Sequence, residues 1–284
     1  MSPYLYALGA IFCWASLPAA TGSALDGLST ESLLLYSFGS GAIFLYLLDV
    51  VRQRSWRLSW PEGKTALLGI WGIFVYHWIY YLALDRAPIA EAAILATTWS
   101  FWMVVFASFQ RFRKLTWPIA VTAVICMVGA GLVISAGKSV AFEGRYLVGY
   151  ALALGCGLIW SSFSVGLAWI KPKEEPMTAF MVMAALLSLL VYLTSGPHAA
   201  PAPSALAAAI YLGCVPLGLS FFLWNRALLG GNIAVIAYLG FLTPPLAVLL
   251  VALMRRETLA AQVIVGMALI LVAAIMGKRV VEKG

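Results

Sequence analysis

The apolar segment at residues 64–84 holds the clearest candidate for chemistry inside a membrane, because His77 lies within it beside Tyr76 and Tyr80. A helix turns by about 100° per residue, so these three side chains fall on one face. Imidazole and phenol groups are costly inside a bilayer and usually face another helix or line a cavity. We therefore expect this face to point inward. Three roles for His77 stay open: a hydrogen bond to a neighbouring helix, contact with a bound ligand, or proton transfer.

Tryptophans lie near the middle of three other apolar segments, at Trp14, Trp99 and Trp160. Tryptophan normally concentrates at the two membrane–water interfaces, and a buried indole N–H seeks a hydrogen-bond partner. Packing alone would also explain each of the three. Their similar depth in separate segments favours a shared aromatic cavity.

Prolines interrupt three apolar segments, at Pro18, at Pro216 and at the pair Pro244 and Pro245. Proline lacks a backbone donor and frees a carbonyl from the helical ladder. In membrane carriers such points bend, gate or bind polar groups of the cargo. The sequence therefore indicates four gating or hinge candidates, with simple packing kinks as the alternative.

Fixed charge is missing from the middle of the apolar segments. Glu91 lies one turn into its segment, Asp49 and Asp85 lie at segment ends, and no Lys or Arg lies at mid-depth. A phosphate-bearing ligand would require fixed positive charge, and proton antiport usually needs an intramembrane carboxylate. We therefore expect a net-neutral, partly apolar ligand. A zwitterion fits, with its ammonium over an aromatic face.

The elements that carry these residues are long apolar stretches. Hydrophobic residues make up 63% of the 284 residues and charged residues 10%, and the mean hydropathy is +0.96. Soluble domains are about 45–50% apolar and about 25% charged. Strand-like alternation is absent, so we predict an all-α membrane protein with ten spanning helices rather than a barrel. The predicted spans are residues 4–23, 29–51, 64–84, 88–110, 115–136, 146–170, 176–195, 203–226, 232–254 and 258–277.

The chain repeats itself. Residues 4–16 and 150–162 agree at six of thirteen positions, with a constant offset of 146, and a second match later in each half has an offset of 144. We therefore divide the chain into two five-span repeats, residues 1–140 and 141–284. An odd number of spans inserts the second repeat upside down. Inverted repeats of this kind are typical of secondary transporters, which bind their cargo near the midplane.

The positive charges predict an orientation. With a cytoplasmic amino terminus, 13 of the 18 Lys and Arg residues lie on the cytoplasmic side of the predicted spans. The positive-inside rule therefore places both termini in the cytoplasm, in a multi-pass protein of the inner membrane. The net charge of +7 reflects this topology, and we expect no nucleic-acid partner. The four cysteines lie far apart inside spans, so we expect neither a metal site nor another cofactor.

The ends of the two halves resemble a known family. In the second half, an Ala-rich run reaches Pro244, a turn follows with the sequence Arg256-Glu257-Thr258-Leu259, and Gly266 opens a last glycine-containing span. The first half departs from this pattern, because Ser100 replaces the proline and Arg113-Lys114-Leu115 lacks the acid. Together with the ten spans in two halves, these features resemble the EamA-type branch of the drug/metabolite transporter superfamily over the whole chain.

Within that branch, the aromatic residues look like those of the YddG-type aromatic amino acid exporters. The resemblance implies export of aromatic and other neutral amino acids through a central, largely hydrophobic cavity. It carries over five cavity residues, and the repeat alone adds Trp14. The carried-over residues are Tyr76, His77, Tyr80, Trp99 and Trp160.

We therefore predict an exporter of neutral amino acids, including aromatic ones, that works by alternating access and without proton antiport. A broad-range drug or metabolite efflux carrier is the alternative on the same fold. A membrane-embedded enzyme is disfavoured, because the sequence lacks H-E-x-x-H and G-x-S-x-G motifs. A channel would need a polar stripe or a charged ring, and neither is present. Because both halves lie in one chain, we expect a monomer.

Overall fold

The computed structural model describes residues 2–135, 141–256 and 258–283. Every regular element in these ranges is a helix, and ten helical segments are long and apolar enough to cross a membrane. The predicted all-α fold with ten spans is therefore confirmed. The repeat boundary predicted at residue 140, and Glu257 of the family motif, lie outside the described residues. The spans are Pro3–Leu25, Thr30–Gln53, Gly63–Arg86, Glu91–Phe112, Trp117–Ser135, Gly144–Ile170, Met177–Thr194, Pro203–Gly230, Ile233–Leu253 and Ala261–Glu282.

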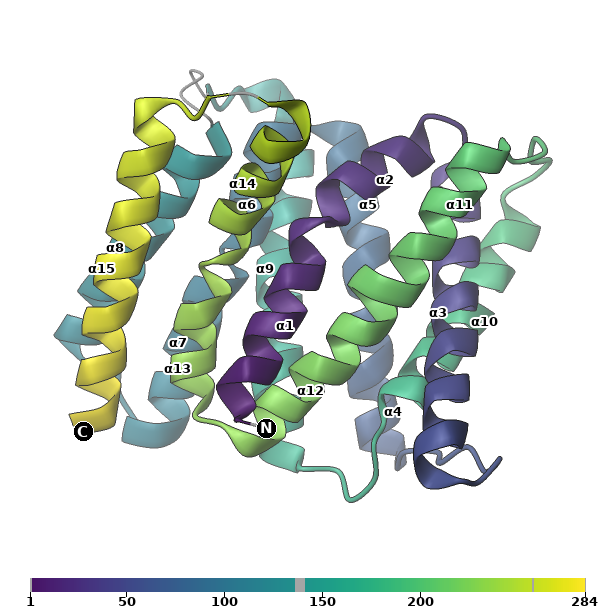
Figure 1. Cartoon of the computed structure of the whole chain (residues 1–284), viewed down its shortest axis with the longest axis horizontal. Helices are drawn as coiled ribbons and strands as arrows, with labels where there is room; N and C mark the ends of the chain where they lie inside the picture. The colour runs from purple at the N-terminus through teal and green to yellow at the C-terminus, as the bar shows by residue number, and fades with distance from the viewer. Residues whose placement is uncertain (1, 136–140, 257, 284) are drawn as a thin grey trace.

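Several spans are divided into shorter helices (Figure 1). Two of these pieces, η1 and η3, are π-helical, and η2 is a single 3₁₀ turn. In chain order the helices are α1 (Pro3–Ala15), α2 (Leu17–Leu25), α3 (Thr30–Gln53), α4 (Gly63–Gly69), η1 (Ile70–Val75), α5 (Tyr76–Arg86), α6 (Ile89–Thr97), α7 (Trp99–Phe112), α8 (Trp117–Ser135), η2 (Gly144–Tyr146), α9 (Leu147–Ile170), α10 (Met177–Thr194), α11 (Pro203–Leu212), η3 (Gly213–Leu219), α12 (Ser220–Gly230), α13 (Ile233–Gly240), α14 (Thr243–Arg255) and α15 (Ala261–Lys283).

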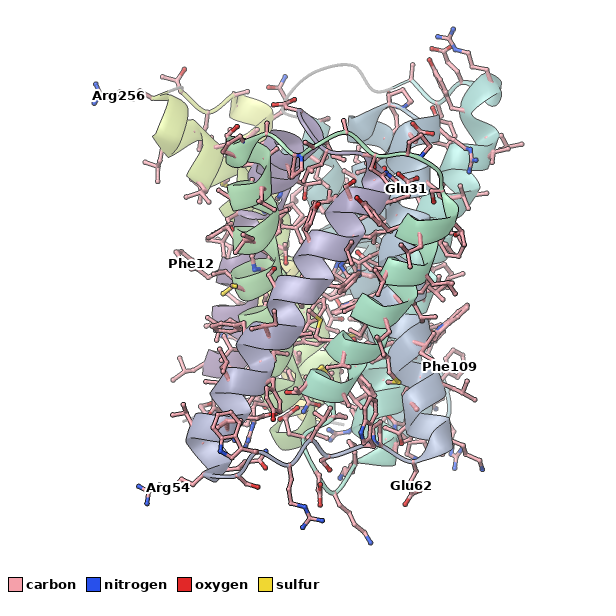
Figure 2. The ribbon with its side chains drawn as sticks, turned by 90° about the vertical axis from the view of Figure 1, so that its right-hand side faces the viewer. Phe12, Glu31, Arg54, Glu62, Phe109 and Arg256 are labelled. Atoms are coloured by element: carbon pink, nitrogen blue, oxygen red, sulfur yellow. The ribbon has the colours of Figure 1, made fainter. Side chains whose placement is uncertain are left out.

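Both chain termini lie at the same face of the molecule, the lower one in Figure 1, as an even number of spans requires. We call it the terminal face. Arg54 and Glu62 also lie there in Figure 2, whereas Glu31 and Arg256 lie at the opposite face. These two faces correspond to the two sides of the membrane.

The helices pair in a way that is matched between the two halves. α8 packs along α15, and α3 packs along α10. α1 packs along α12, and α5 packs along α9. Exchanging corresponding spans of the two halves converts the α1–α12 pair into the α9–α5 pair. This correspondence supports the two inverted repeats, which stay a prediction.

Two glycines set the close approach of α8 and α15. A Cβ on Gly129 would lie 2.7 Å from the carbonyl oxygen of Gly266, and a Cβ on Gly266 would lie 2.6 Å from that of Gly129. Backbone oxygens cannot move aside as a flexible side chain can. Small residues are therefore needed where these two helices touch.

The predicted proline positions coincide with irregular backbone. Pro18 lies in the first turn of α2, and Pro244 and Pro245 lie in the first turn of α14. A helix leaves the backbone donors of its first turn unpaired, so proline costs little there. Pro216 lies inside the π-helical segment η3. The role of these residues as hinges stays a prediction.

The fourth span breaks without a proline. α6 ends at Thr97 and α7 begins at Trp99, and the hydroxyl of Thr98 donates to the carbonyl of Leu95 at 2.6 Å. Side chains of this kind take up backbone acceptors where a helix is interrupted. The repeat offset of 144 places Thr98 opposite Leu242, which precedes α14 at the break of the ninth span. Both halves therefore break at the same place, although only the second has prolines there.

Candidate functional site

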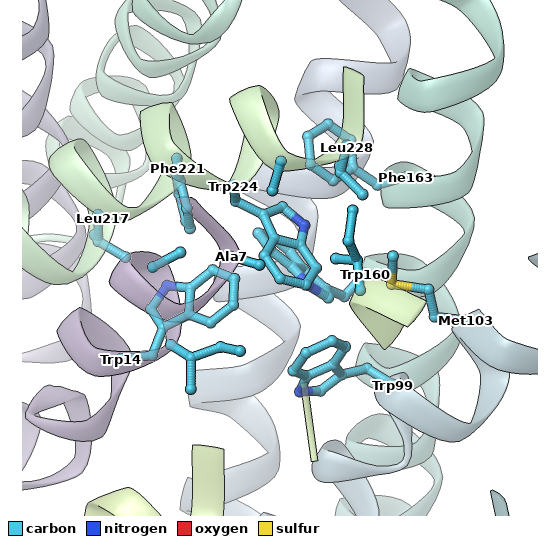
Figure 3. Packing of buried hydrophobic residues seen from close by; sticks show 14 of the residues in the cluster. Ala7, Trp14, Trp99, Met103, Trp160, Phe163, Leu217, Phe221, Trp224 and Leu228 are labelled. Carbon is cyan, nitrogen blue, oxygen red and sulfur yellow. The ribbon is translucent and has the colours of Figure 1, made fainter. Parts of the chain in front are cut away.

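Four tryptophans meet where α1, α7, α9 and α12 come together (Figure 3). The ring centroid of Trp14 lies 6.0 Å from that of Trp99, 5.5 Å from that of Trp160 and 5.0 Å from that of Trp224. Trp99 and Trp224 are 5.7 Å apart and nearly perpendicular, at 88°. Edge-to-face contacts at these distances are favourable for aromatic rings. The four side chains, which we call the tryptophan cluster, join the two halves of the chain.

Two of these indoles are anchored by hydrogen bonds. Nε1 of Trp14 donates to the carbonyl of Pro216 at 3.0 Å, and Nε1 of Trp224 donates to the hydroxyl of Ser164 at 3.1 Å. The Pro216 carbonyl belongs to η3, a π-helical turn of a kind that is frequent at functional sites. The backbone irregularity at Pro216 therefore holds a tryptophan of another span in place.

The other two indoles are held by packing. The ring centroids of Trp160 and Tyr76 are 5.3 Å apart. Trp99 packs against Gly240, and a Cβ added to Gly240 would lie 2.3 Å from the Cη2 atom of Trp99. Within the part of the chain that the structure describes, neither Trp99 nor Trp160 uses its N–H in a hydrogen bond. These two donors are therefore available to a ligand.

The polar face of α5 meets the tryptophan cluster as predicted from helical spacing. The rings of Tyr76 and Tyr80 are parallel to within 3°, with centroids 6.1 Å apart. Nδ1 of His77 lies 2.7 Å from the carbonyl oxygen of Ile73, one turn earlier in the same span. A carbonyl oxygen only accepts, so Nδ1 carries the proton and Nε2 of the neutral ring is an acceptor. This hydrogen bond stays within the span rather than reaching a neighbouring helix.

A cavity of about 720 Å³ lies against the tryptophan cluster. It extends along α14 to Thr258, Leu259 and Ala260, in the connection beside Arg256 at the opposite face. Its described lining is aromatic, aliphatic and hydroxyl-bearing, and contains no charged side chain. The cavity therefore opens toward the opposite face, and the tryptophan cluster closes it on the terminal side. All six residues predicted to bind cargo line it: Trp14, Tyr76, His77, Tyr80, Trp99 and Trp160.

The prolines divide into two pairs. Pro18 and Pro244 line the cavity, whereas Pro216 and Pro245 do not. Pro18 and Pro244 each begin a helix that leads from the cavity toward the opposite face, so a change at either bend would reshape the cavity wall.

Three further residues belong to the site, and sequence reasoning missed them: Phe221, Trp224 and Thr243. Phe221 and Thr243 line the cavity, and Trp224 lies behind it in the tryptophan cluster. The repeat would have found them. At the offset of 144 they correspond, in the same order, to His77, Tyr80 and Trp99.

No carboxylate among the described residues lines this cavity. Glu91, in the first turn of α6, is 8% exposed and does not line it. Among the described residues, no group of three His, Cys, Asp or Glu side chains is placed to hold a metal ion. The arrangement can therefore bind a ligand through ring faces, hydroxyls and indole N–H groups.

Ten apolar spans around a deep cavity, whose described lining is uncharged, define a multi-pass membrane protein. The family model of the EamA-like transporter family matches the chain twice, over residues 1–135 and 147–277. The chain belongs to this family and is a membrane transporter.

Individual proteins resemble it over nearly their whole length. An aromatic amino acid exporter YddG from Ancylobacter novellus is 29% identical over 88% of this chain and 87% of its own. A protein of the same name from Salmonella typhimurium is 21% identical, over 90% of this chain and 89% of its own. A crystal structure of a protein 26% identical in sequence superimposes with a TM-score of 0.87, covering 98% of this chain and 97% of the other. The predicted family resemblance is confirmed.

Proposed function

We propose that this transporter exports neutral amino acids, aromatic ones included, from the inner side of the plasma membrane by alternating access. The observation that carries the proposal is the cavity of about 720 Å³, whose described lining of aromatic rings, aliphatic side chains and hydroxyls includes no charged side chain. Its volume falls within the range of about 300–1,000 Å³ typical of small-molecule sites. The names of the two YddG relatives give independent support for amino acid cargo.

The lining can satisfy each part of a zwitterion. A cation is attracted to the faces of Trp and Tyr, so the ammonium would lie against the rings of Tyr76 or Trp160. The carboxylate needs donors, and the N–H groups of Trp99 and Trp160 and the hydroxyl of Tyr80 can supply them. Nε2 of His77 can accept from the ammonium. An apolar side chain would face the aliphatic residues of α14.

Alternating access would exchange the roles of the two halves. The cavity now reaches the opposite face, with the tryptophan cluster on its terminal side. If residues 1–140 and 141–284 are inverted repeats, the two repeats can exchange their conformations. That exchange opens the terminal face and closes the opposite face. The bends at Pro18 and Pro244, and the breaks at Thr98 and Leu242, would absorb the change.

The charges favour an uncoupled carrier with cytoplasmic termini. A proton antiporter usually holds a carboxylate in its pathway, and the described lining of the cavity contains none. The excess of Lys and Arg on the terminal side supports a cytoplasmic terminal face. Because one chain contains both halves, we expect a monomer to be sufficient for transport. Transport of this kind requires no enzymatic step.

Flux measurements in proteoliposomes test the proposal. We expect saturable uptake of labelled phenylalanine and threonine down their gradients, and no accumulation against these gradients when a pH gradient is imposed. Absence of flux above protein-free liposomes would refute amino acid cargo, and accumulation driven by the pH gradient would refute the uncoupled mechanism. Competition experiments distinguish an amino acid exporter from a broad-range drug or metabolite efflux carrier. Flux through a drug carrier would be inhibited more strongly by lipophilic cations than by tryptophan.

A further inference from the structure

A second cluster of polar side chains lies at the terminal face, outside the cavity. Glu175 lies in the connection from α9 to α10 and packs against α12, although its position in a loop would suggest exposure. Nδ2 of Asn225 donates to its Oε1 atom, and Nε of Arg226 lies 3.4 Å from its Oε2 atom. The side chain of Glu175 is 8% exposed. We call these three residues the Glu175 cluster.

Charged groups of α3 surround this cluster. Asp49 accepts a hydrogen bond from Thr178 at the start of α10 and pairs with Arg52 at 3.2 Å. The guanidinium carbon of Arg52 lies 4.6 Å from the ring centroid of Phe222, and that of Arg226 lies 5.3 Å from the same centroid. Both cations therefore lie near the Phe222 ring, and Arg226 pairs with Glu175 while Arg52 pairs with Asp49.

Other charged residues of this connection are exposed. The preceding residue, Glu174, accepts a hydrogen bond from Ser59 in the connection after α3, and Lys171 and Lys173 are open to solvent. Burial therefore distinguishes Glu175 from the neighbouring carboxylate of Glu174.

The Glu175 cluster is the last of three contacts that hold α9 and its following connection against α12. At the cavity, the rings of Trp160 and Phe221 are 5.3 Å apart. One turn further toward the terminal face, Trp224 donates to Ser164 at 3.1 Å. Figure 3 shows Trp160, Trp224 and Phe221 in this boundary. For cargo to pass from the cavity to the terminal face along this boundary, all three contacts must separate.

Burial favours a proton on Glu175. Burial raises the pKa of Glu175 from its ordinary value of 4.5 to about 7, although Arg226 and the hydrogen bonds from Asn225 and the Met177 amide lower the pKa, and Asp49 raises it further. The buried Nε of Arg226 has no hydrogen-bond partner among the described residues, so Arg226 supports the carboxylate through its charge and not through a hydrogen bond from Nε. Burial therefore outweighs the ion pair.

Asn225 offers an acceptor for that proton. Its Oδ1 atom is buried and has no hydrogen-bond partner among the described residues. A flip of the amide exchanges Oδ1 with Nδ2, because the two atoms occupy equivalent places. Oδ1 then lies beside Glu175, where a protonated carboxyl can donate to it and a carboxylate cannot.

We propose that the Glu175 cluster is the terminal-side gate of this carrier, and that Glu175 takes up a proton when the gate closes and releases it when the gate opens. The proposal rests on the alternating-access function above. Glu175 exchanges its proton with the terminal side in both steps, so the pH on that side sets how often the gate opens. A pH gradient supplies no driving force, in keeping with an uncoupled carrier.

The direction of the pH effect follows from proton linkage. In the closed gate Glu175 is buried and binds a proton below about pH 7. In an open gate, contact with water would return the pKa of Glu175 to its ordinary range. Both states are ionised at pH 8, and only the closed state is largely protonated at pH 6. The ratio of open to closed molecules should therefore fall about tenfold from pH 8 to pH 6.

Spin-label distances across the boundary test this without any cargo. Cysteines introduced at the exposed Ser2 and Lys173, in a chain whose native cysteines are replaced by alanine, place one label before α1 and one after α9. The longer label-to-label distance reports the open gate and the shorter one the closed gate. We expect the ratio of the long-distance to the short-distance population to fall about tenfold between pH 8 and pH 6. With Glu175→Gln, which fixes a neutral side chain, the population should stay low at both pH values. Glu174→Gln is the matched control and should respond as the unsubstituted chain does.

Equal distance populations at pH 6 and pH 8 in the unsubstituted chain would overturn the gate, even if the Glu175→Gln protein failed to fold. An unchanged pH response in Glu175→Gln would also overturn it. The amino acid function fails by a different result, absence of amino acid flux in liposomes, and that result leaves the distance measurement intact.

Discussion

Gly240→Ala tests whether Trp99 forms part of the cargo site. A Cβ at residue 240 would lie 2.3 Å from Cη2 and 2.7 Å from Cζ3 of Trp99. The indole is rigid, and on its other sides it meets Trp14 at 6.0 Å and Trp224 at 5.7 Å. It can therefore move only into the cavity. Overpacking of this kind costs about 1–3 kcal/mol. Cargo that needs the space entered by the indole must push it back, and a cost of that size is about 5- to 150-fold in affinity.

We expect Gly240→Ala to weaken tryptophan flux in proteoliposomes by at least about fivefold, and threonine flux by less, because a narrowed cavity excludes large cargo first. Gly155→Ala is the matched control, because a Cβ at that helical position meets nothing within 4 Å. Undiminished tryptophan flux in a folded Gly240→Ala protein would refute the reasoning.

Three further changes test other parts of the structure. His77→Ala should lower amino acid flux while the protein still inserts and folds, because the cavity loses its Nε2 acceptor; unchanged flux would return His77 to a packing role. Glu91→Gln should leave flux largely intact, because Glu91 does not line the cavity; loss of flux in correctly inserted protein would remove the basis for an uncoupled carrier. Gly129→Ala should lower the thermal midpoint of unfolding, because overpacking costs about 1–3 kcal/mol of stability. Gly131→Ala, where a Cβ meets nothing within 4 Å, should be neutral or stabilising. Equal midpoints for the two glycine variants would contradict the close approach of α8 and α15.

The broken spans show how far sequence patterns reach. Pro18, Pro244 and Pro245 mark two breaks correctly, because proline fits only the first turn of a helix without cost. The break at Thr98 has no such marker and depends on a hydroxyl that caps the preceding turn. The repeat offset would have predicted it from Leu242, since two copies of one unit tend to keep their bends.

The sequence by itself determined the ten helical spans, the family and the six aromatic and imidazole residues that the structure places around one cavity. It could do so because a bilayer allows only internally hydrogen-bonded spans of about twenty apolar residues, and because polar groups inside it must face inward. Whether these residues bind cargo stays a prediction.

Only the tertiary structure decided which residues join them and which side is closed. Helical periodicity fixes the residues that share a face, but not the rotation of one helix against its neighbour. Trp224 and Phe221 therefore became part of the site only when α12 was placed beside α1 and α9. Glu175 lies in a connection that the sequence presents as exposed, and packing against α12 buries it. Burial is a property of the whole arrangement, so the pKa of this carboxyl could not be inferred from its neighbours along the chain.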